Sequence, residues 1–383
     1  MIVCYFGTYR KEYSRNKIMI AALRSADVEV KECHVSLWHG IEDRVNVTLS
    51  GWRSPKFWWR VIKAYSQLLW KYQKIGEYDI LMVGYPGQVD VFLARILANI
   101  KKKPLVWDVF MSLYLVAKER KLDQNKGSSV ELIRKIESKA LNKPDLLIQD
   151  TAEYVKWFQK VYGIKPERFK LVPTGADDRI FKPLPESKNC DGLFHVLYYG
   201  TFIPNHGVMH IVKAAQLLKD EHEIIFDMIG DGPDRERVEE FVKSNKLKNV
   251  RFYNWMTQKN LLEYINSADV CLGAFGDTPQ SLMTVQNKIY ECMAMGKLVI
   301  TGRSPAIQNN FKEGKHILSV ERNHIAIAEK LYNLQRNPKQ KRNIAKEGKN
   351  LFYSNFDLFN LGITLKKMLD EVKHKNTSMN KQQ

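Results

Sequence analysis

QNKIYECMAMGKLVITG, residues 286–302, predicts a helix followed by a buried strand. Gly296 marks the end of the helix, and the apolar run LVI after it is typical of a strand in a protein core. Glu291 lies on this helix one turn after Lys288. Taken alone, the spacing favours an exposed Lys–Glu pair at i,i+3, since acids are only probabilistic markers of a site. The rest of the chain decides between these interpretations.

The same alternation of apolar strand and amphipathic helix extends along most of the chain. In the first half the apolar runs are IVCYFG, VEVKECHV, YDILMVG, KPLVWDVF, PDLLIQD and FKLVPTG, and in the second half they are HVLYYG, EIIFDMIG, NVRFYNW, ADVCLGAF, KLVITG and HILSV. Continuous apolar strands separated by helices predict parallel sheets covered on both faces. Two runs of six strands therefore predict an α/β protein with two doubly wound, Rossmann-like domains.

The expected linker between these domains is DDRIFKPLPESKNCDG, residues 177–192, which has two prolines and no apolar periodicity. We therefore expect an N-terminal domain over residues 1–183 and a C-terminal domain over 184–355. Residues 356–383 are expected to form a helix that packs back on the first domain and frays at its end. Ligands of open parallel sheets bind at the carboxyl ends of the strands, so two domains facing one another predict a shared cleft.

Composition restricts the class of partner and the compartment. The net charge is +18 over 383 residues, and residues 1–183 hold 32 basic and 20 acidic side chains. This excess suits nucleic acid, phosphosugars or lipid headgroups, but no nucleic-acid-binding signature is present. The five cysteines are scattered, no apolar run reaches the roughly 18 residues of a membrane span, and the N-terminus lacks a signal-peptide pattern. We expect a cytoplasmic chain in a reducing compartment.

Three loops follow predicted strands and carry glycines that allow a close approach of the backbone to a ligand. They are FGTYRKEYSRNK, YYGTFIPNHGVMHIVKAA and IGDGPDRERVEE, in which Gly7, Gly200 and Gly230 come directly after the strand. The helix after each loop offers free backbone N–H groups to an anion. Each loop is also consistent with an ordinary strand-to-helix turn.

Together with VRFYNWMTQKNLLEYINSADVCLG and NKIYECMAMGKLVITG, these loops give the chain a resemblance to family-4 retaining glycosyltransferases. The segments FGTY, LIRKIESKALNKPDLLIQDT and LVPTGADDRIF extend the resemblance over nearly the whole chain. It implies a GT-B fold and a retaining, hexosyltransferase-type enzyme that needs no metal or other cofactor. The donor would be a nucleotide-diphosphate sugar bound by the C-terminal domain. The acceptor, bound by the N-terminal domain, would be a hydroxyl of a lipid-linked or envelope glycan.

The resemblance also assigns residues to the donor site. Glu291 would bind the ribose hydroxyls, because a carboxylate can accept both protons of a cis-diol, and Trp255 and Met256 would cradle the base. The donor-binding set that we predict is Gly7, Thr8, Arg15, Gly200, Thr201, His206, Gly207, Gly230, Trp255, Met256, Lys288 and Glu291.

The chain departs from the family pattern at four positions. The first of the two family glutamates is replaced by Met283, and the usual Arg and Lys of the phosphate loop are replaced by Thr201 and His206. Lys288 and Arg15 are our candidates to replace the two lost cations.

The histidine that the family places after the fourth strand is also missing. Asp108 is the polar residue there, and we predict that it is the catalytic residue facing the donor sugar. The alternative is that Asp108 caps the helix that begins near SLYLVAKER.

Residues 51–76, GWRSPKFWWRVIKAYSQLLWKYQKIG, combine half of the tryptophans of the chain, Trp52 among them, with six basic residues and no acid. On a helix from Pro55, one stripe would contain Trp58, Ile62, Tyr65 and Leu69. Either this stripe faces the core, or the helix lies on an anionic membrane surface. We favour a membrane or acceptor surface, formed by Trp58, Trp59, Arg60 and Lys63.

Two rival functions stay open at this stage. A GT-B sugar-nucleotide epimerase would release an altered sugar nucleotide and would need no acceptor surface. A non-catalytic basic protein that binds RNA or anionic membrane is the alternative from another class.

Overall fold

The structure is a computed structural model that describes residues 1–37, 54–185 and 191–381. The chain divides into two compact units, the first made of Met1–Pro173 with Leu358–Gln383 and the second of Thr174–Asp357. The division falls at Pro173, whereas the sequence placed it near residue 183. Trp52 and residues 186–190 of the expected linker lie outside the described residues.

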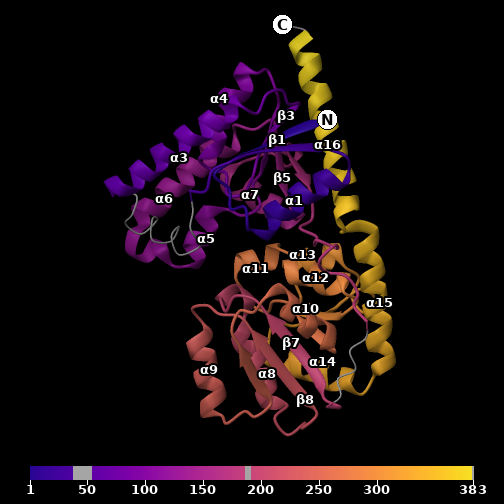
Figure 1. Ribbon diagram of the computed structural model, residues 1–383. Coiled ribbons are helices and arrows are strands. Elements are labelled where there is room, and N and C mark those ends of the chain that lie inside the picture. Colours follow the sequence, from indigo (N-terminus) through magenta and orange to yellow (C-terminus); the bar gives the residue numbers. More distant parts are fainter. Residues whose placement is uncertain (38–53, 186–190, 382–383) are drawn as a thin grey trace. The chain divides into compact units, whose positions relative to one another are not determined.

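Unit 1 is built on a parallel sheet of six strands in the order β2-β1-β3-β4-β5-β6 (Figure 1). The strands are β1 Ile2–Gly7, β2 Glu29–His34, β3 Ile80–Val83, β4 Leu105–Asp108, β5 Leu146–Gln149 and β6 Phe169–Leu171. Every one of these corresponds to a predicted apolar run. β3, β4 and β5 are buried along their whole length, which explains why their sequences are continuously apolar rather than alternating.

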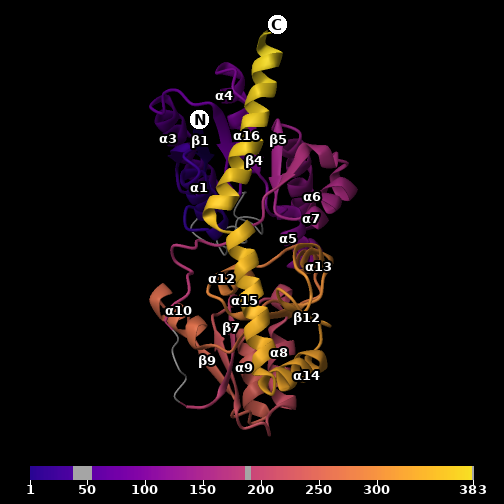
Figure 2. The same ribbon diagram turned by 90° about the vertical axis from the view of Figure 1, so that its right-hand side faces the viewer.

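Helices cover both faces of this sheet. They are α1 Ser14–Ser25, α3 Pro55–Gln73, α4 Asp90–Ile100, α5 Leu113–Glu119, α6 Leu122–Leu141, α7 Ala152–Tyr162 and α16 Leu358–Lys381. The last helix returns to unit 1, where its apolar side joins the core formed by α1 and the sheet. Ser25 Oγ donates a hydrogen bond to Leu358 O across 2.8 Å, and Figure 2 shows α16 running along the side of unit 1 that holds α1.

Unit 2 has the same layers around a parallel sheet in the order β12-β11-β10-β7-β8-β9. Its strands are β7 Phe194–Tyr199, β8 Ile224–Ile229, β9 Val250–Tyr253, β10 Val270–Leu272, β11 Leu298–Gly302 and β12 Leu318–Val320. Its helices are η3 Pro204–His206, α8 Val208–Leu217, α9 Arg235–Ser244, α10 Gln258–Ser267, α11 Pro279–Met283, α12 Asn287–Ala294, α13 Pro305–Asn310, α14 His324–Gln335 and α15 Pro338–Asn355. One core lies under α8, α9 and α14, and the other lies under α10, α12 and α15.

The strand orders locate the ligand edge of each unit. In unit 2 the order reverses between β7 and β10, and in unit 1 it reverses between β1 and β3. In open α/β sheets the crevice at such a reversal, outside the carboxyl ends of the strands, is where ligands bind. The loops after β1, β3, β7 and β10 are therefore the first places to look for a site. Among the described residues, no helix is both long enough and apolar enough to cross a bilayer.

Candidate functional site

The loop after β1 is fixed to the first residue of α4. Asp90 accepts hydrogen bonds from Thr8 N at 2.7 Å, from Thr8 Oγ1 at 3.0 Å and from the Tyr65 hydroxyl at 2.7 Å. Burial raises the pKa of Asp90 to about 6. Gly7 packs against the same carboxylate. Thr8 is itself buried at the ligand edge of unit 1. Its N–H and its hydroxyl both have an internal hydrogen-bond partner, Asp90.

Arg15 and Asp108 form a buried, two-pronged ion pair. Arg15 Nε and Nη2 each lie 2.9 Å from an oxygen of Asp108, and Nη1 donates to Val172 O and Pro173 O. Neither side chain has exposed surface. The structure therefore places both residues inside unit 1 rather than at a surface where they would touch a phosphate or a donor sugar.

The alternative in which Asp108 caps the next helix is wrong. Ser112 is the residue before α5, and its side chain accepts a hydrogen bond from Leu115 N. A serine at this position satisfies one of the free N–H groups of the helix. Asp108 has no such contact, because its two oxygens are engaged by Arg15.

In unit 2 the loops after β7 and β8 touch through two glycines. A β-carbon on Gly230 would lie 2.1 Å from Gly200 O, and one on Gly200 would lie 2.8 Å from Lys288 Nζ. Both glycines have positive φ, +144° at Gly200 and +129° at Gly230. Only glycine fits this backbone conformation and this close approach without strain. The two loops therefore meet at the carboxyl ends of β7 and β8, beside the reversal of strand order between β7 and β10, and Lys288 Nζ lies next to Gly200.

Lys288, on α12, extends its side chain toward Gly200. Its side chain is 6% exposed, and Nζ lies 4.1 Å from the centroid of the Tyr198 ring. Within residues 1–37, 54–185 and 191–381, Nζ has no hydrogen-bond partner. Burial lowers the pKa of Lys288 to about 7. The interpretation of Lys288 and Glu291 as an exposed surface pair is therefore wrong.

Glu291 lies one turn further along α12 and is held by a tyrosine. The Tyr199 hydroxyl donates to Glu291 Oε2 across 2.6 Å, and Glu291 as a whole residue is half-buried. Burial raises the pKa of Glu291, while the hydrogen bond from Tyr199 and the nearby Lys288 act in the opposite direction. Tyr199 was not predicted. Its only signal in the sequence is a place at the end of a strand, next to the glycine of a candidate loop.

His206 is a neutral member of the same cluster. Its Nδ1 lies 2.6 Å from Thr201 O, and since a carbonyl oxygen only accepts, Nδ1 carries the hydrogen. Burial and the neighbouring Lys288 lower the pKa of His206 to about 3. His206 therefore supplies no positive charge at neutral pH. We call Gly200, His206, Gly230, Lys288 and Glu291 the Gly200 cluster.

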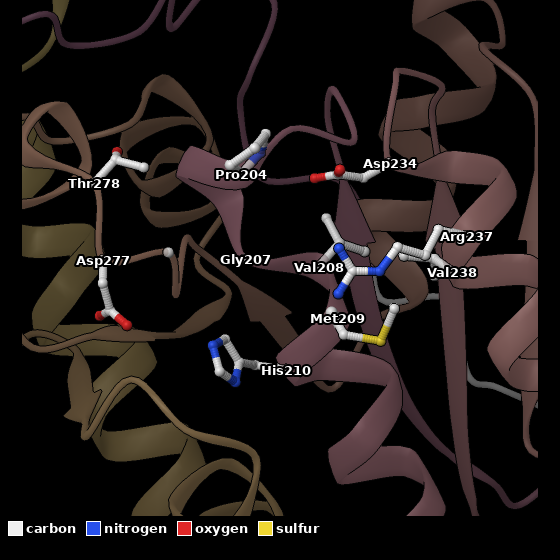
Figure 3. Close-up of a pocket in the computed structure, with 11 residues that line it drawn as sticks. Pro204, Gly207, Val208, Met209, His210, Asp234, Arg237, Val238, Asp277 and Thr278 are labelled. Carbon is white, nitrogen blue, oxygen red and sulfur yellow. The ribbon is translucent and has the colours of Figure 1, made fainter. Parts of the chain in front are cut away.

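The remaining predicted residues lie around the edge of unit 2. Trp255, directly after β9, is 56% exposed, and Met256 packs against the core under α10 and α12. Gly207 precedes α8 and lines a pocket of about 320 Å³ (Figure 3). Figure 3 shows His210 and Asp277 on one side of this pocket and Arg237 on the other. The pocket shares none of its lining residues with the Gly200 cluster.

The helix from Pro55 is present in unit 1 and exposes its three tryptophans, Trp58, Trp59 and Trp70. Trp58 is 51% and Trp59 is 71% exposed, while the residues that α3 buries are Ala64 and Leu68. Lys63 is also exposed, and Arg60 is half-buried. The alternative in which Trp58 belongs to a core-facing stripe is therefore wrong. Ile62, Leu69 and Trp70 extend the apolar surface along the helix.

Within the residues that the structure describes, no group of three or more His, Cys, Asp or Glu side chains is arranged to hold a metal ion. The independence from metal that the family resemblance implies stays a prediction.

Comparison with known proteins agrees with this architecture. Residues 194–337, most of unit 2, match the protein family described as Glycosyl transferases group 1. A search of curated protein sequences finds no match to the chain.

Similar solved structures cover both units. The HepE protein of Anabaena, crystallised with UDP, is 15% identical, with a TM-score of 0.69 over 97% of this chain and 99% of that one. Sucrose-phosphate synthase from Thermosynechococcus elongatus is 15% identical, with a TM-score of 0.73 over the same shares. A glycosyltransferase from Rickettsia africae is 13% identical, with a TM-score of 0.65 over 97% of this chain and 98% of that one. The chain has the GT-B fold, and the family match over unit 2 supports a GT-B glycosyltransferase.

Proposed function

We propose that the protein is a retaining glycosyltransferase that moves a hexosyl group from a nucleotide-diphosphate sugar to a hydroxyl acceptor without a metal ion. The observation that carries the proposal is the Gly200 cluster. Two glycine loops touch at the carboxyl ends of β7 and β8, and beside Gly200 lies a buried lysine whose Nζ has no hydrogen-bond partner in the described part of the chain. A buried lysine without a partner is costly to keep charged unless a ligand supplies an acceptor. The domain that holds it matches a glycosyltransferase family.

The chemistry of the cluster suits a diphosphate leaving group. The loop after β7 presents its backbone and the start of α8, where free N–H groups favour an anion. Lys288, which lies against Gly200 of the same loop, would supply a cation. Negative charge grows on the diphosphate as the sugar leaves, so donors already positioned there stabilise the transition state more than the ground state.

Glu291 is suited to the nucleoside part of the donor. Its carboxylate accepts one hydrogen bond from Tyr199 and has further lone pairs for the two ribose hydroxyls. Trp255, exposed after β9, would stack on or flank the base. HepE of Anabaena has been crystallised with UDP and with UDP-glucose, which makes uridine nucleotides the first donors to test.

We further propose that the acceptor is carried on a lipid or envelope glycan and that α3 lies against an anionic membrane on its cytoplasmic side. Trp58, Trp59, Ile62 and Trp70 are exposed on a helix that lacks acidic residues and carries Lys56, Arg60, Lys63 and Lys71. Aromatic insertion and attraction between cations and anionic headgroups would act together at such a surface.

A panel of UDP-, GDP-, ADP- and TDP-sugars, assayed for release of the nucleoside diphosphate in buffer containing EDTA, tests the proposal. The expected result is slow hydrolysis of one donor class, with further release when total lipid extract is added as acceptor. An altered sugar nucleotide without release of diphosphate would indicate an epimerase instead. No turnover and no binding across the panel, together with tight binding to RNA or vesicles, would indicate the non-catalytic alternative.

A further inference from the structure

We propose that Lys288 is held without its proton in the empty site and takes up one proton when a phosphate group of the donor binds at the Gly200 loop. This inference rests on the proposed function, because it concerns the same donor site. The proton comes from the solvent, and the ammonium group that results forms the ion pair with the phosphate.

The first reason is the burial of an unpaired amine. Lys288 is 6% exposed, and no hydrogen-bond partner for Nζ is found in the described part of the chain. An ammonium ion carries three N–H donors and is strongly hydrated in water. Enclosing it with no acceptor is unfavourable, so a buried group of this kind loses its proton instead.

The second reason is the charge of the groups around Nζ. The titratable groups that face it are Tyr198 and Tyr199 from β7, His206 from η3, and Glu291 and Cys292 from its own helix. Burial raises the pKa of both tyrosines and of Cys292, so these three groups are neutral at neutral pH. His206 is neutral because its pKa is lowered to about 3. Glu291 is the one potential counter-charge among these five, and its carboxylate is hydrogen-bonded to Tyr199.

The third reason is the effect of a bound phosphate group on the pKa of Lys288. Lys288 has a pKa of about 7 in the empty site. A phosphate group within hydrogen-bond distance of Nζ would supply both the missing acceptor and the missing counter-charge, and each of these raises the pKa of an amine. Above pH 7 the bound site therefore holds one more proton than the empty site. Binding that takes up a proton must weaken as the proton concentration falls.

The experiment is isothermal titration calorimetry at pH 8.5 with whichever of UDP, GDP, ADP and TDP binds the protein most tightly. Titrations in three buffers with different ionisation enthalpies give the number of protons taken up. We expect about one proton per nucleotide in the wild type, and a Kd that rises about tenfold from pH 8 to pH 9. Lys288→Arg keeps the cation but is protonated throughout this range, so uptake should disappear.

Lys297→Met is the matched control. Lys297 is a second poorly exposed lysine of unit 2, and its Nζ donates to Asn266 O away from the Gly200 loop. This variant should take up the proton as the wild type does. Binding by the wild type without uptake, or uptake that persists in Lys288→Arg, would overturn the inference and leave the proposed function intact. If Lys288→Arg does not fold, the pH dependence of the wild-type Kd decides alone. Failure of the wild type to bind any of the four nucleotides would overturn the donor site itself.

Discussion

The Tyr199 hydroxyl donates to Glu291 Oε2 across 2.6 Å and joins the last residue of β7 to the middle of α12. Tyr199 is buried, and Glu291 is half-buried with its carboxyl group at the edge of the Gly200 cluster. The hydrogen bond fixes the direction of a carboxylate that would otherwise rotate freely. In the proposed donor site, Tyr199 would be a positioning residue and Glu291 the residue that touches the ribose.

Glu291→Ala should raise the donor Kd by about tenfold to a hundredfold, since hydrogen bonds to a charged group are worth roughly 1.5–3 kcal/mol. Tyr199→Phe should raise it by less, about twofold to tenfold, because the carboxylate remains but loses its orientation. Calorimetric titration measures both. Tyr72→Phe is the control, because it removes a tyrosine hydroxyl that is hydrogen-bonded to Tyr78 in unit 1. Unchanged donor affinity in Glu291→Ala would show that Glu291 does not contact the donor.

Lys288→Met should stabilise the fold while it weakens donor binding. The folded pKa of Lys288 is about 7, well below the value near 10.4 of an unfolded lysine. The unfolded chain therefore binds more protons between these values, and the contribution of Lys288 to stability rises with pH across this window. The advantage of Lys288→Met in urea unfolding should shrink by about 2 kcal/mol from pH 7 to pH 9. An advantage that does not change with pH would show that the lysine is charged in the folded protein.

Asp108→Asn should lower the stability of the protein by about 3–5 kcal/mol, because it removes the carboxylate that pairs directly with the buried guanidinium of Arg15. Replacing both partners, as in Arg15→Met/Asp108→Leu, should recover much of this loss. Urea unfolding measures the stability, and donor turnover is measured on the folded fraction. An Asp108→Asn protein that unfolds like the wild type but has lost turnover would indicate that Asp108 takes part in the reaction.

Charge reversal on α3 should release the protein from anionic vesicles. Each basic residue near the surface is worth about 1 kcal/mol, so Arg60→Glu/Lys63→Glu should weaken co-sedimentation tenfold or more, and added salt should weaken the wild type. Trp58→Ser/Trp59→Ser should reduce binding even at low salt without lowering the melting temperature, because both side chains are already exposed. Lys219→Glu/Lys243→Glu, two exposed lysines of unit 2, is the control. Equal sedimentation of the α3 and control variants would contradict the membrane surface.

The fold could be predicted because its central strands are buried on both faces. Runs such as ILMV at β3 and LLI at β5 stay apolar at successive positions, and such runs separated by helices indicate a parallel sheet. The boundary between the units was harder to place. Residues 177–183 have the composition of a linker but belong to unit 2, where Phe181 packs against the core.

The site was only partly predictable, because its deciding contacts are distant in sequence. Arg15 and Asp108 are 93 residues apart, and nothing local to either residue indicates that they form a pair. Tyr199 and Glu291 are 92 residues apart. The spacing of Lys288 and Glu291 suggested a surface pair, whereas the tertiary structure buries the lysine and gives the glutamate a tyrosine partner. The positions of Gly200 and Gly230 were informative, because the loops after β7 and β8 approach one another too closely for a β-carbon.

The most direct test of the account is the melting temperature of the wild type and of Glu291→Ala with saturating UDP-, GDP-, ADP- or TDP-sugar. A ligand that binds only the folded state stabilises it by about 2.7 kcal/mol at a hundred times its Kd. We expect one donor class to raise the wild-type melting temperature by a few degrees and that of Glu291→Ala by about half as much or less at the same concentration. If no sugar nucleotide shifts the wild type, or if one shifts both proteins equally, the donor site does not lie at the Gly200 cluster.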